Sequence, residues 1–313
     1  MKRYTYGVLF AASSGVLFGL APFLIQTAYA GGANGITTVF LRSALALPVL
    51  FLLARLKGER LAVSRKEIGQ LLLLGVCGSA MTSFLLYSSY TYISTGIATT
   101  LHFSYPLLVN IGCAVFLRER FTKVKLAALL LGLLGIVLFM GNDSDLQPTG
   151  VALALLSSVS YAFYMIYMSA SGLKCFPPFK LAFYVSLVVS IATGLFGLIT
   201  KQITLSLTPT AWGTTLMLAC GISIGANSLF QLGIRDAGAS TTAILSTLEP
   251  ITSVLMGCFL LHEGISGQKL AGCLCIFGSV LTITVSNALQ GKIGSKQYPI
   301  SSHKKSKSKE NTI

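Results

Sequence analysis

The sequence has few charged residues for its length. Only 10% of its 313 residues are Asp, Glu, Lys or Arg, whereas 53% are hydrophobic. A soluble globular domain averages about 25% charged residues, so this shortage indicates an integral membrane protein. The net charge of +14 could suggest a nucleic-acid partner, but the basic residues lie in short connections and in the C-terminal tail, where they set membrane orientation. We therefore expect a lipid bilayer and no nucleic acid around the chain.

Motifs of nucleotide and metal chemistry are also missing. The sequence has no Walker-type phosphate-binding loop, so direct drive by ATP is not expected. Six of the seven cysteines lie inside apolar runs, where a cysteine is usually a small hydrophobe. Cys273 and Cys275 are two positions apart and point to different sides of a helix, which makes them a poor metal pair. We predict no cofactor, no metal site and no disulfide.

Long apolar runs predict an all-α membrane fold of ten spans, because a membrane-spanning helix needs about 20 apolar residues. The expected spans are Tyr6–Tyr29, Gly35–Leu56, Ile68–Tyr90, Thr95–Leu117, Lys125–Gly141, Thr149–Ser171, Phe179–Thr200, Thr210–Ile234, Ala239–Leu261 and Gln268–Asn287.

One stretch of the chain occurs twice. Thr95–Leu138 aligns without a gap on Ala239–Thr282 at an offset of 144, and Pro106 falls on Pro250. The match extends to other helices, so the repeating unit is five spans. Because five is odd, the second unit must enter the membrane from the opposite side, which gives an inverted repeat. Two matched prolines, each beside a polar residue, favour a substrate path over tolerated kinks.

The predicted organisation is two five-helix repeats and a tail. The first repeat covers residues 1–141 and the second covers residues 149–287. Residues 288–313 form a basic tail that we expect to be disordered, either as a solvated topology signal or as a segment attracted to anionic lipid. With the N-terminus inside, twenty of the 23 Lys and Arg face the cytoplasm. Both termini are therefore predicted to be cytoplasmic in a multi-pass protein of the cell membrane.

These features resemble the EamA type of the drug/metabolite transporter superfamily, over about residues 6–287. That family has ten spans in two inverted repeats, with a mid-span proline in the fourth and ninth helices and a later Gly-Glu-Arg or similar. The matching residues are Tyr105-Pro106 and Arg118-Glu119-Arg120 in the first half, and Glu249-Pro250 and His262-Glu263-Gly264 in the second. The family's usual glycine is replaced by Arg118 and His262, and its arginine is lost at Gly264.

The resemblance implies a membrane transporter of small metabolites such as amino acids or drug-like compounds, most often an exporter. An importer, for example of choline or an amino acid, is the alternative, and a homodimer is possible. A different class would be an intramembrane enzyme acting on a lipid-linked substrate. That class needs clustered carboxylates or a nucleophile with a base, and only Glu249 with His102 could serve. We therefore do not expect an enzyme.

Ionisable residues inside spans are the main site candidates, because a central charge costs about 2.5–3.5 kcal/mol. Glu249 lies near the middle of the ninth span and could bind protons, or act as a structural carboxyl. Arg42 in the second span could pair with Glu249, hold an anionic group of the substrate, or only pack near the outer interface. His102 in the fourth span matches Ser246 in the repeat, and could line a cavity or be a satisfied core residue.

Polar residues at helical spacing complete the predicted path. Amides and phenols in the third and eighth spans suit neutral or zwitterionic ligands, and Tyr161 and Tyr164 could supply walls. The two halves are expected to rock around a midplane cavity lined by helices one to four and six to nine, with coupling to protons or to the substrate gradient. The predicted path comprises Arg42, Ser83, Tyr87, Thr99, His102, Tyr105, Asn227, Gln231, Ser246 and Glu249, with helix breaks at Pro106 and Pro250.

Overall fold

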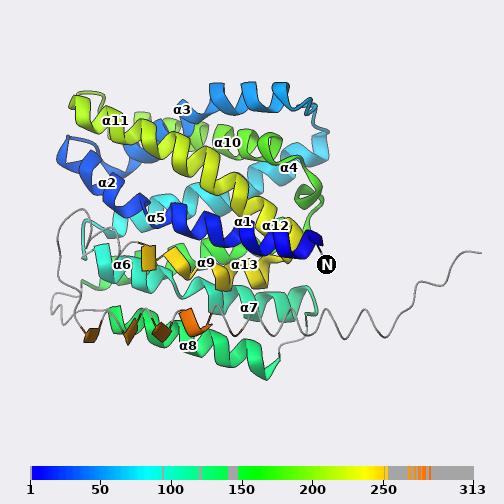
Figure 1. Cartoon of the computed structure of the whole chain (residues 1–313). Helices are drawn as coiled ribbons and strands as arrows, with labels where there is room; N and C mark the ends of the chain where they lie inside the picture. The colour runs from blue at the N-terminus through cyan, green and yellow to red at the C-terminus, as the bar shows by residue number, and fades with distance from the viewer. Residues whose placement is uncertain are drawn as a thin grey trace, which may run out of the picture.

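A computed structural model shows that the chain folds as a layered bundle of helices, without a β-strand in the described part (Figure 1). The structure describes residues 2–93, 95–119, 122–139, 147–249, 251–252, 267–268, 271–272, 274–275, 277–279 and 282. Within these ranges, six helical stretches are long and apolar enough to cross a membrane: Arg3–Ala30, Gly35–Leu56, Arg65–Ser89, Pro148–Ala170, Pro178–Ile199 and Pro209–Ala237. The all-α membrane fold is thus confirmed, while the count of ten spans depends partly on residues outside the described ranges.

The helices of the first half are α1 (Lys2–Phe18), α2 (Ala21–Ala30), α3 (Gly35–Leu56), α4 (Arg65–Leu73), the π-helical η1 (Leu74–Ala80), α5 (Met81–Ser89), α6 (Thr95–His102), α7 (Tyr105–Phe116) and α8 (Lys123–Phe139). Those of the second half are α9 (Pro148–Ala170), the short η2 (Gly172–Cys175), α10 (Pro178–Ile199), α11 (Pro209–Met217), the π-helical η3 (Leu218–Ala226), α12 (Asn227–Ala237) and α13 (Ala239–Leu245).

Polar caps set several helix starts. The Asn34 side chain accepts a hydrogen bond from the backbone N–H of Thr37 at the start of α3. Ser64 and Glu67 form a reciprocal capping box at the start of α4, which satisfies two backbone donors that have no partner within the helix. These caps fix where the chain re-enters the bundle after each connection.

Two spans contain a helix break. The fourth span divides into α6 and α7, with Pro106 in the first turn of α7. The first span, expected as one continuous helix, divides into α1 and α2, and Pro22 lies in the first turn of α2. A proline in a first turn loses no intrahelical hydrogen bond, which explains why both helices restart there. Pro250 lies outside the described residues.

A π-helical segment occurs in both the third and the eighth spans. One begins at Leu74 and the other at Leu218, positions that the repeat offset relates. Sequence periodicity did not predict either segment. π segments widen a helix locally and are frequent at functional sites. Their matched positions therefore favour a functional role for the helices that follow, α5 and α12.

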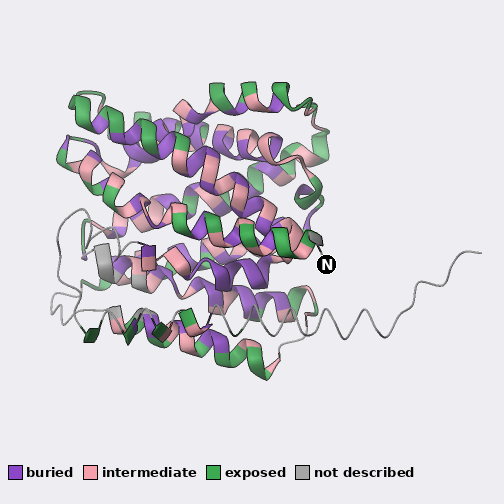
Figure 2. Ribbon diagram, in the orientation of Figure 1, coloured by how far each residue is buried: buried purple, intermediate pink, exposed green. Residues whose placement is uncertain are grey.

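The packing between the halves is symmetrical. Helix α1 packs on α12, and in the same way α9 packs on α5. Helix α3 packs on its own repeat partner α10, and α7 packs on α13. Exchanging the two halves carries the α1–α12 pair into the α9–α5 pair and the α3–α10 pair into itself, as a two-fold repeat requires. Figure 2 shows the buried positions on helix faces turned into the bundle, with exposed positions on its outer faces.

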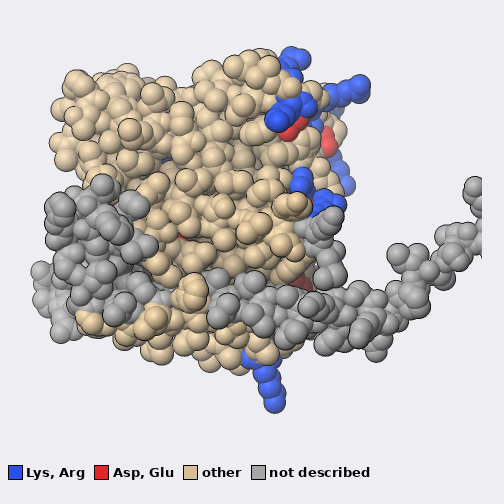
Figure 3. Space-filling model, viewed as in Figure 1, with Lys and Arg blue, Asp and Glu red and all other residues tan. Residues whose placement is uncertain are grey.

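Charge is concentrated at one end of the bundle. Figure 3 shows the Lys and Arg side chains of this face gathered at the end where the chain begins, and the rest of the described part of this face almost without charge. Arg3 of α1 and Arg235 of α12 both contact the carboxylate of Asp236 at 2.8 Å. Lys180 donates to the carbonyl oxygen of Ala62 at 2.7 Å. These contacts join neighbouring segments at the basic end.

Gly19, in the turn between α1 and α2, allows the first span to pass close to the ninth. A Cβ atom at Gly19 would lie 2.5 Å from Cβ of Thr252 and 2.7 Å from the carbonyl oxygen of Glu249. Gly19→Ala is therefore expected to destabilise the protein by about 1–3 kcal/mol, the usual cost of overpacking. The control is Gly221→Ala, whose Cβ would meet nothing within 4 Å. Thermal unfolding in detergent should show a lower Tm for Gly19→Ala only, and equal Tm values would contradict this packing.

Candidate functional site

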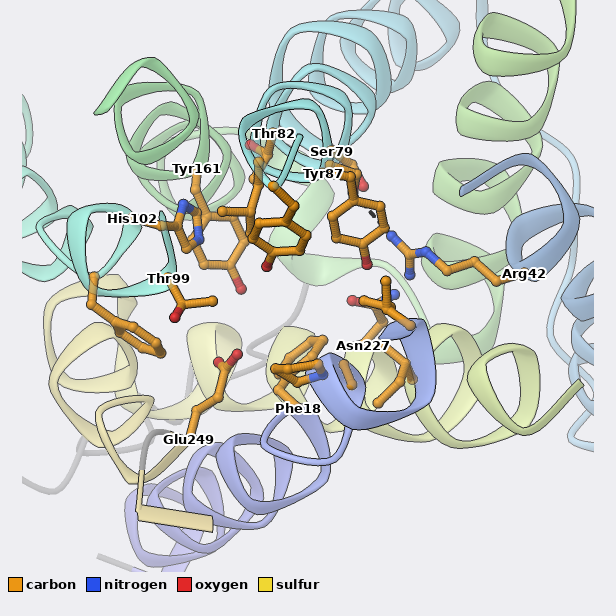
Figure 4. A pocket seen from close by; sticks show the side chains of 18 of the residues that line it. Phe18, Arg42, Ser79, Thr82, Tyr87, Thr99, His102, Tyr161, Asn227 and Glu249 are labelled. Atoms are coloured by element: carbon orange, nitrogen blue, oxygen red, sulfur yellow. Dashed lines mark hydrogen bonds between the residues drawn. The ribbon is translucent and has the colours of Figure 1, made fainter. Parts of the chain in front are cut away.

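A cavity of about 100 Å³ lies between the two halves, and α2, α5 and α6, which help to line it, lie away from the N-terminal end of the bundle (Figure 1). Its walls come from α1, α2, α3, η1, α5, α6, α9, η3, α12 and the residues after α13. The seventh span, α10, was expected to line it but does not, because it packs behind α3 and η1. Seven of the predicted path residues line it: Arg42, Ser83, Tyr87, Thr99, His102, Asn227 and Glu249. Figure 4 shows their side chains converging from different helices.

Three predicted path residues lie behind this wall. Tyr105 is fully buried, and its ring packs against that of Tyr161 at 4.7 Å between centroids. Gln231 is buried and donates to the hydroxyl oxygen of Tyr164 at 3.2 Å. Ser246 donates to the carbonyl oxygen of Thr242 at 2.9 Å. Tyr105 and Gln231 thus contact the lining residues Tyr161 and Tyr164, whereas Ser246 bonds to its own helix, and none of the three lines the cavity.

Arg42 is a buried cation held by hydroxyl groups. It is only 7% exposed, and its Nη2 atom donates to Oγ of Ser83 at 3.0 Å while Nη1 lies 3.4 Å from Oγ of Ser223. Its Nε atom has no hydrogen-bond partner within the described residues. No ion pair joins Arg42 to Glu249, although the structure describes both. A buried guanidinium with neutral partners has unused capacity to bind an anionic group.

Glu249 lies on the opposite side of the cavity from Arg42 (Figure 4). Its backbone N–H donates to the carbonyl oxygen of Ser246 at 3.0 Å, in the turn that follows α13. Its side chain is half-buried, and within the described residues its carboxyl group forms no ion pair or hydrogen bond. The cavity therefore holds a cationic group at one side and an acidic group at the other.

His102 is fixed by one ring nitrogen. Its Nδ1 atom lies 2.8 Å from Oγ of Ser157 on α9. Its ring lies 5.3 Å from that of Tyr105 and 5.5 Å from that of Tyr161, measured between centroids. His102 is thus held between helices of both repeats while still lining the cavity.

A cluster of aromatic rings packs beside the cavity. Phe230 lies one turn beyond the lining residue Asn227 on α12, and its ring stacks on that of Tyr161 at 5.6 Å. Phe18 meets the edge of Phe230 at 5.9 Å. Together with Tyr105 these rings come from α1, α7, α9 and α12, so both halves contribute to the cluster.

Sequence reasoning missed several lining residues. The additional residues are Phe18, Ala21, Pro22, Ile25, Ser79, Thr82, Leu86, Tyr90, Phe103 and Ile222. Tyr161 and Tyr164, suggested as possible walls, also line the cavity. Pro22 was the signal that could have revealed the broken first span, because a proline in the middle of an apolar run interrupts the helix just before it.

Comparisons with known proteins agree with this architecture. The EamA-like transporter family matches the sequence twice, over residues 5–141 and 148–285. The chain belongs to this family. An uncharacterized transporter of Archaeoglobus fulgidus is 27% identical over 71% of this chain and 79% of its own. The threonine/homoserine exporter RhtA of Salmonella typhimurium is 29% identical over 80% of this chain and 83% of its own.

A solved crystal structure shares the fold. It superimposes with a TM-score of 0.80, covering 90% of this chain and 97% of its own at 17% identity. The tandem EamA match and the transporter relatives place the protein among membrane transporters of small metabolites and not among enzymes. The resemblance to the drug/metabolite transporter superfamily is thereby confirmed, and the intramembrane enzyme is ruled out as its class.

Proposed function

We propose that this EamA-family protein transports a small zwitterionic metabolite of the amino-acid type, and that it does so by alternating access. The observation that carries the proposal is the placement of Arg42 and Glu249 on opposite sides of one cavity. In a bound amino acid, the carboxylate would meet the guanidinium and the ammonium group would meet the carboxylate of Glu249. Charge-assisted hydrogen bonds at both ends would offset the loss of hydration in the bilayer.

The hydroxyl and amide groups between the two charges suit such a ligand. Ser83 and Asn227 line the cavity near Arg42, and Thr99 lines it near Glu249 (Figure 4). Choline carries no carboxylate and would leave the buried Arg42 without an anionic partner. Drug-like cations also lack a carboxylate and would leave Arg42 in the same state. The charge arrangement therefore favours an amino acid over these alternatives.

Export is the proposed direction, with both termini in the cytoplasm. The relatives named as threonine/homoserine exporters support export, and the basic end of the bundle supports an inside position for the N-terminus. The cavity would then lie nearer the extracellular side. Rocking of the two halves would open the cavity toward the cytoplasm and close it toward the outside. Glu249 could also carry a proton on the return step.

Transport by purified protein in liposomes would test this proposal. Vesicles loaded with L-threonine should take up external radiolabelled L-threonine by exchange, and unlabelled L-homoserine should compete. Unlabelled choline should not compete. Exchange of choline without exchange of any amino acid would contradict the proposal, and competition by choline alone would favour the importer of a cationic metabolite.

A buried hydrogen bond across the halves is expected to hold the basic end closed. Ser240 on α13 donates to the side-chain oxygen of Asn110 on α7 at 2.5 Å, and both residues are buried. Asn110→Ala should shift the equilibrium toward opening at that end by roughly 2- to 10-fold, the value of one net hydrogen bond of about 0.5–1.5 kcal/mol. Cys113 lies one turn further along α7 and is fully buried.

Reaction of Cys113 with an impermeant maleimide, added to inverted vesicles, measures this shift. The other six cysteines would be replaced by serine. The labelling rate should rise in Asn110→Ala and in Ser240→Ala. The control is Ser228→Ala, because Oγ of Ser228 has no hydrogen-bond partner within the described residues. An unchanged rate in both test variants would show that this bond does not keep the end closed.

A further inference from the structure

The hydrogen bonds of Ser157 determine which nitrogen of His102 carries a proton. Oγ of Ser157 lies 2.6 Å from the carbonyl oxygen of Ala154 and 2.8 Å from Nδ1 of His102. The hydroxyl has one hydrogen. If it went to His102, two lone-pair-bearing oxygens would face each other at 2.6 Å without a proton between them. The hydroxyl therefore donates to Ala154 and accepts from His102.

The same arrangement recurs at neighbouring serines. Ser158 donates to the carbonyl oxygen of Leu155 at 2.7 Å and accepts from the hydroxyl of Ser104 at 2.9 Å. Ser14, which the repeat places at the position of Ser157, donates to the carbonyl oxygen of Ala11 at 2.8 Å. A serine hydroxyl that bonds back to its own helix is thus a regular feature of these spans, and it leaves an acceptor for a neighbouring donor.

We infer that Ser157 holds His102 in the tautomer with hydrogen on Nδ1, so that Nε2 and the carboxylate of Glu249 form an acceptor subsite for a primary ammonium group. Ser157 is a positioning residue, since it lies outside the cavity lining and acts only through His102. His102 and Glu249 both line the cavity, with Thr99 beside them (Figure 4). In this tautomer Nε2 has a free lone pair and no hydrogen, so it repels a carboxylate and binds an N–H donor.

This inference rests on the proposed function, since it assigns the ammonium end of the substrate. It also separates the two ends of the cavity chemically. The guanidinium of Arg42 offers only donors, whereas Nε2 of His102 and an ionised carboxylate of Glu249 offer only acceptors. An amino acid would therefore bind in one orientation.

Nitrogen NMR of protein labelled with ¹⁵N-histidine in lipid nanodiscs tests the tautomer directly. The sequence has three histidines, and a His102→Gln sample assigns the signal of His102. The expected result is a protonated Nδ1 and an unprotonated Nε2. In Ser157→Ala both neutral tautomers of His102 should be populated, whereas the control Ser158→Ala should leave the His102 signals unchanged. A protonated Nε2 in the wild type, or no change in Ser157→Ala, would overturn the inference.

Ligand titration then tests the subsite. L-threonine should shift the Nε2 signal of His102, and N-acetyl-L-threonine, which has no ammonium group, should not. Ser157→Ala should raise the Kd for L-threonine roughly 2- to 10-fold, as expected for one neutral hydrogen bond. Calorimetric binding of L-threonine without any Nε2 shift would overturn the ammonium role. Binding with the Nε2 shift but without exchange in liposomes would leave the subsite intact and overturn transport.

Discussion

Replacing Glu249 by glutamine is expected to lower the affinity for a zwitterionic substrate by roughly 10- to 100-fold. The carboxylate is the acidic group of the cavity, and it has no protein cation as partner within the described residues. Hydrogen bonds to charged groups contribute about 1.5–3 kcal/mol, and each 1.4 kcal/mol is a factor of ten. Glutamine keeps the size of the side chain, so the loss of substrate affinity would reflect the missing charge and not a change in packing.

Exchange of L-threonine in liposomes, at matched protein amounts, measures this effect. Glu67→Gln is the matched control, because Glu67 caps α4 at the surface and glutamine supports the same capping box. The control should exchange at the wild-type rate. Full exchange by Glu249→Gln would remove Glu249 from the substrate path and leave it a structural role.

Replacing Arg42 by glutamine is expected to cause a loss of similar size at the other end of the substrate. Arg42 is buried, its Nε atom is unpaired within the described residues, and its serine partners carry no charge. The variant would therefore lose a charge-assisted contact to the substrate carboxylate, worth roughly 10- to 100-fold in affinity. Arg42→Lys should recover only part of it, since an ammonium group cannot bind a carboxylate with a planar pair of donors.

Arg55→Gln is the matched control for this experiment. Arg55 lies on the same helix, α3, and its guanidinium packs over the ring of Phe51 at 5.2 Å, away from the cavity. The Arg55→Gln variant should therefore exchange L-threonine at the wild-type rate. Wild-type exchange by Arg42→Gln would contradict a carboxylate-binding role and favour simple packing near the interface.

The sequence was sufficient to predict the fold and part of the site. The scarcity of charge predicted the membrane bundle, and the duplicated segment predicted an inverted repeat, with which the matched packing of α1 on α12 and of α9 on α5 agrees. Arg42, His102 and Glu249 were found because a buried ionisable group in a span is costly and therefore uncommon. Each was identified from its own chemistry, without knowledge of its neighbours.

Three-dimensional information was needed for the rest. The π segments at Leu74 and Leu218 have no distinctive composition, and the contacts that stabilise them come from other helices. Tyr105 and Gln231 were placed on the cavity face by helical spacing, but Tyr105 packs against Tyr161 and Gln231 bonds to Tyr164, so each lies behind a lining tyrosine. Ser157 could not be singled out, since its role depends on a contact with a residue 55 positions away.

Binding of L-threonine and two blocked derivatives to the purified variants tests the central claim most directly. Calorimetry would compare L-threonine, its methyl ester, which has no carboxylate, and N-acetyl-L-threonine, which has no ammonium group. The wild type should bind L-threonine more tightly than either derivative. Arg42→Gln should no longer prefer L-threonine over the methyl ester but should still prefer it over the N-acetyl derivative. Glu249→Gln should show the opposite pattern. Equal binding of all three ligands by the wild type would contradict recognition of a zwitterion by Arg42 and Glu249.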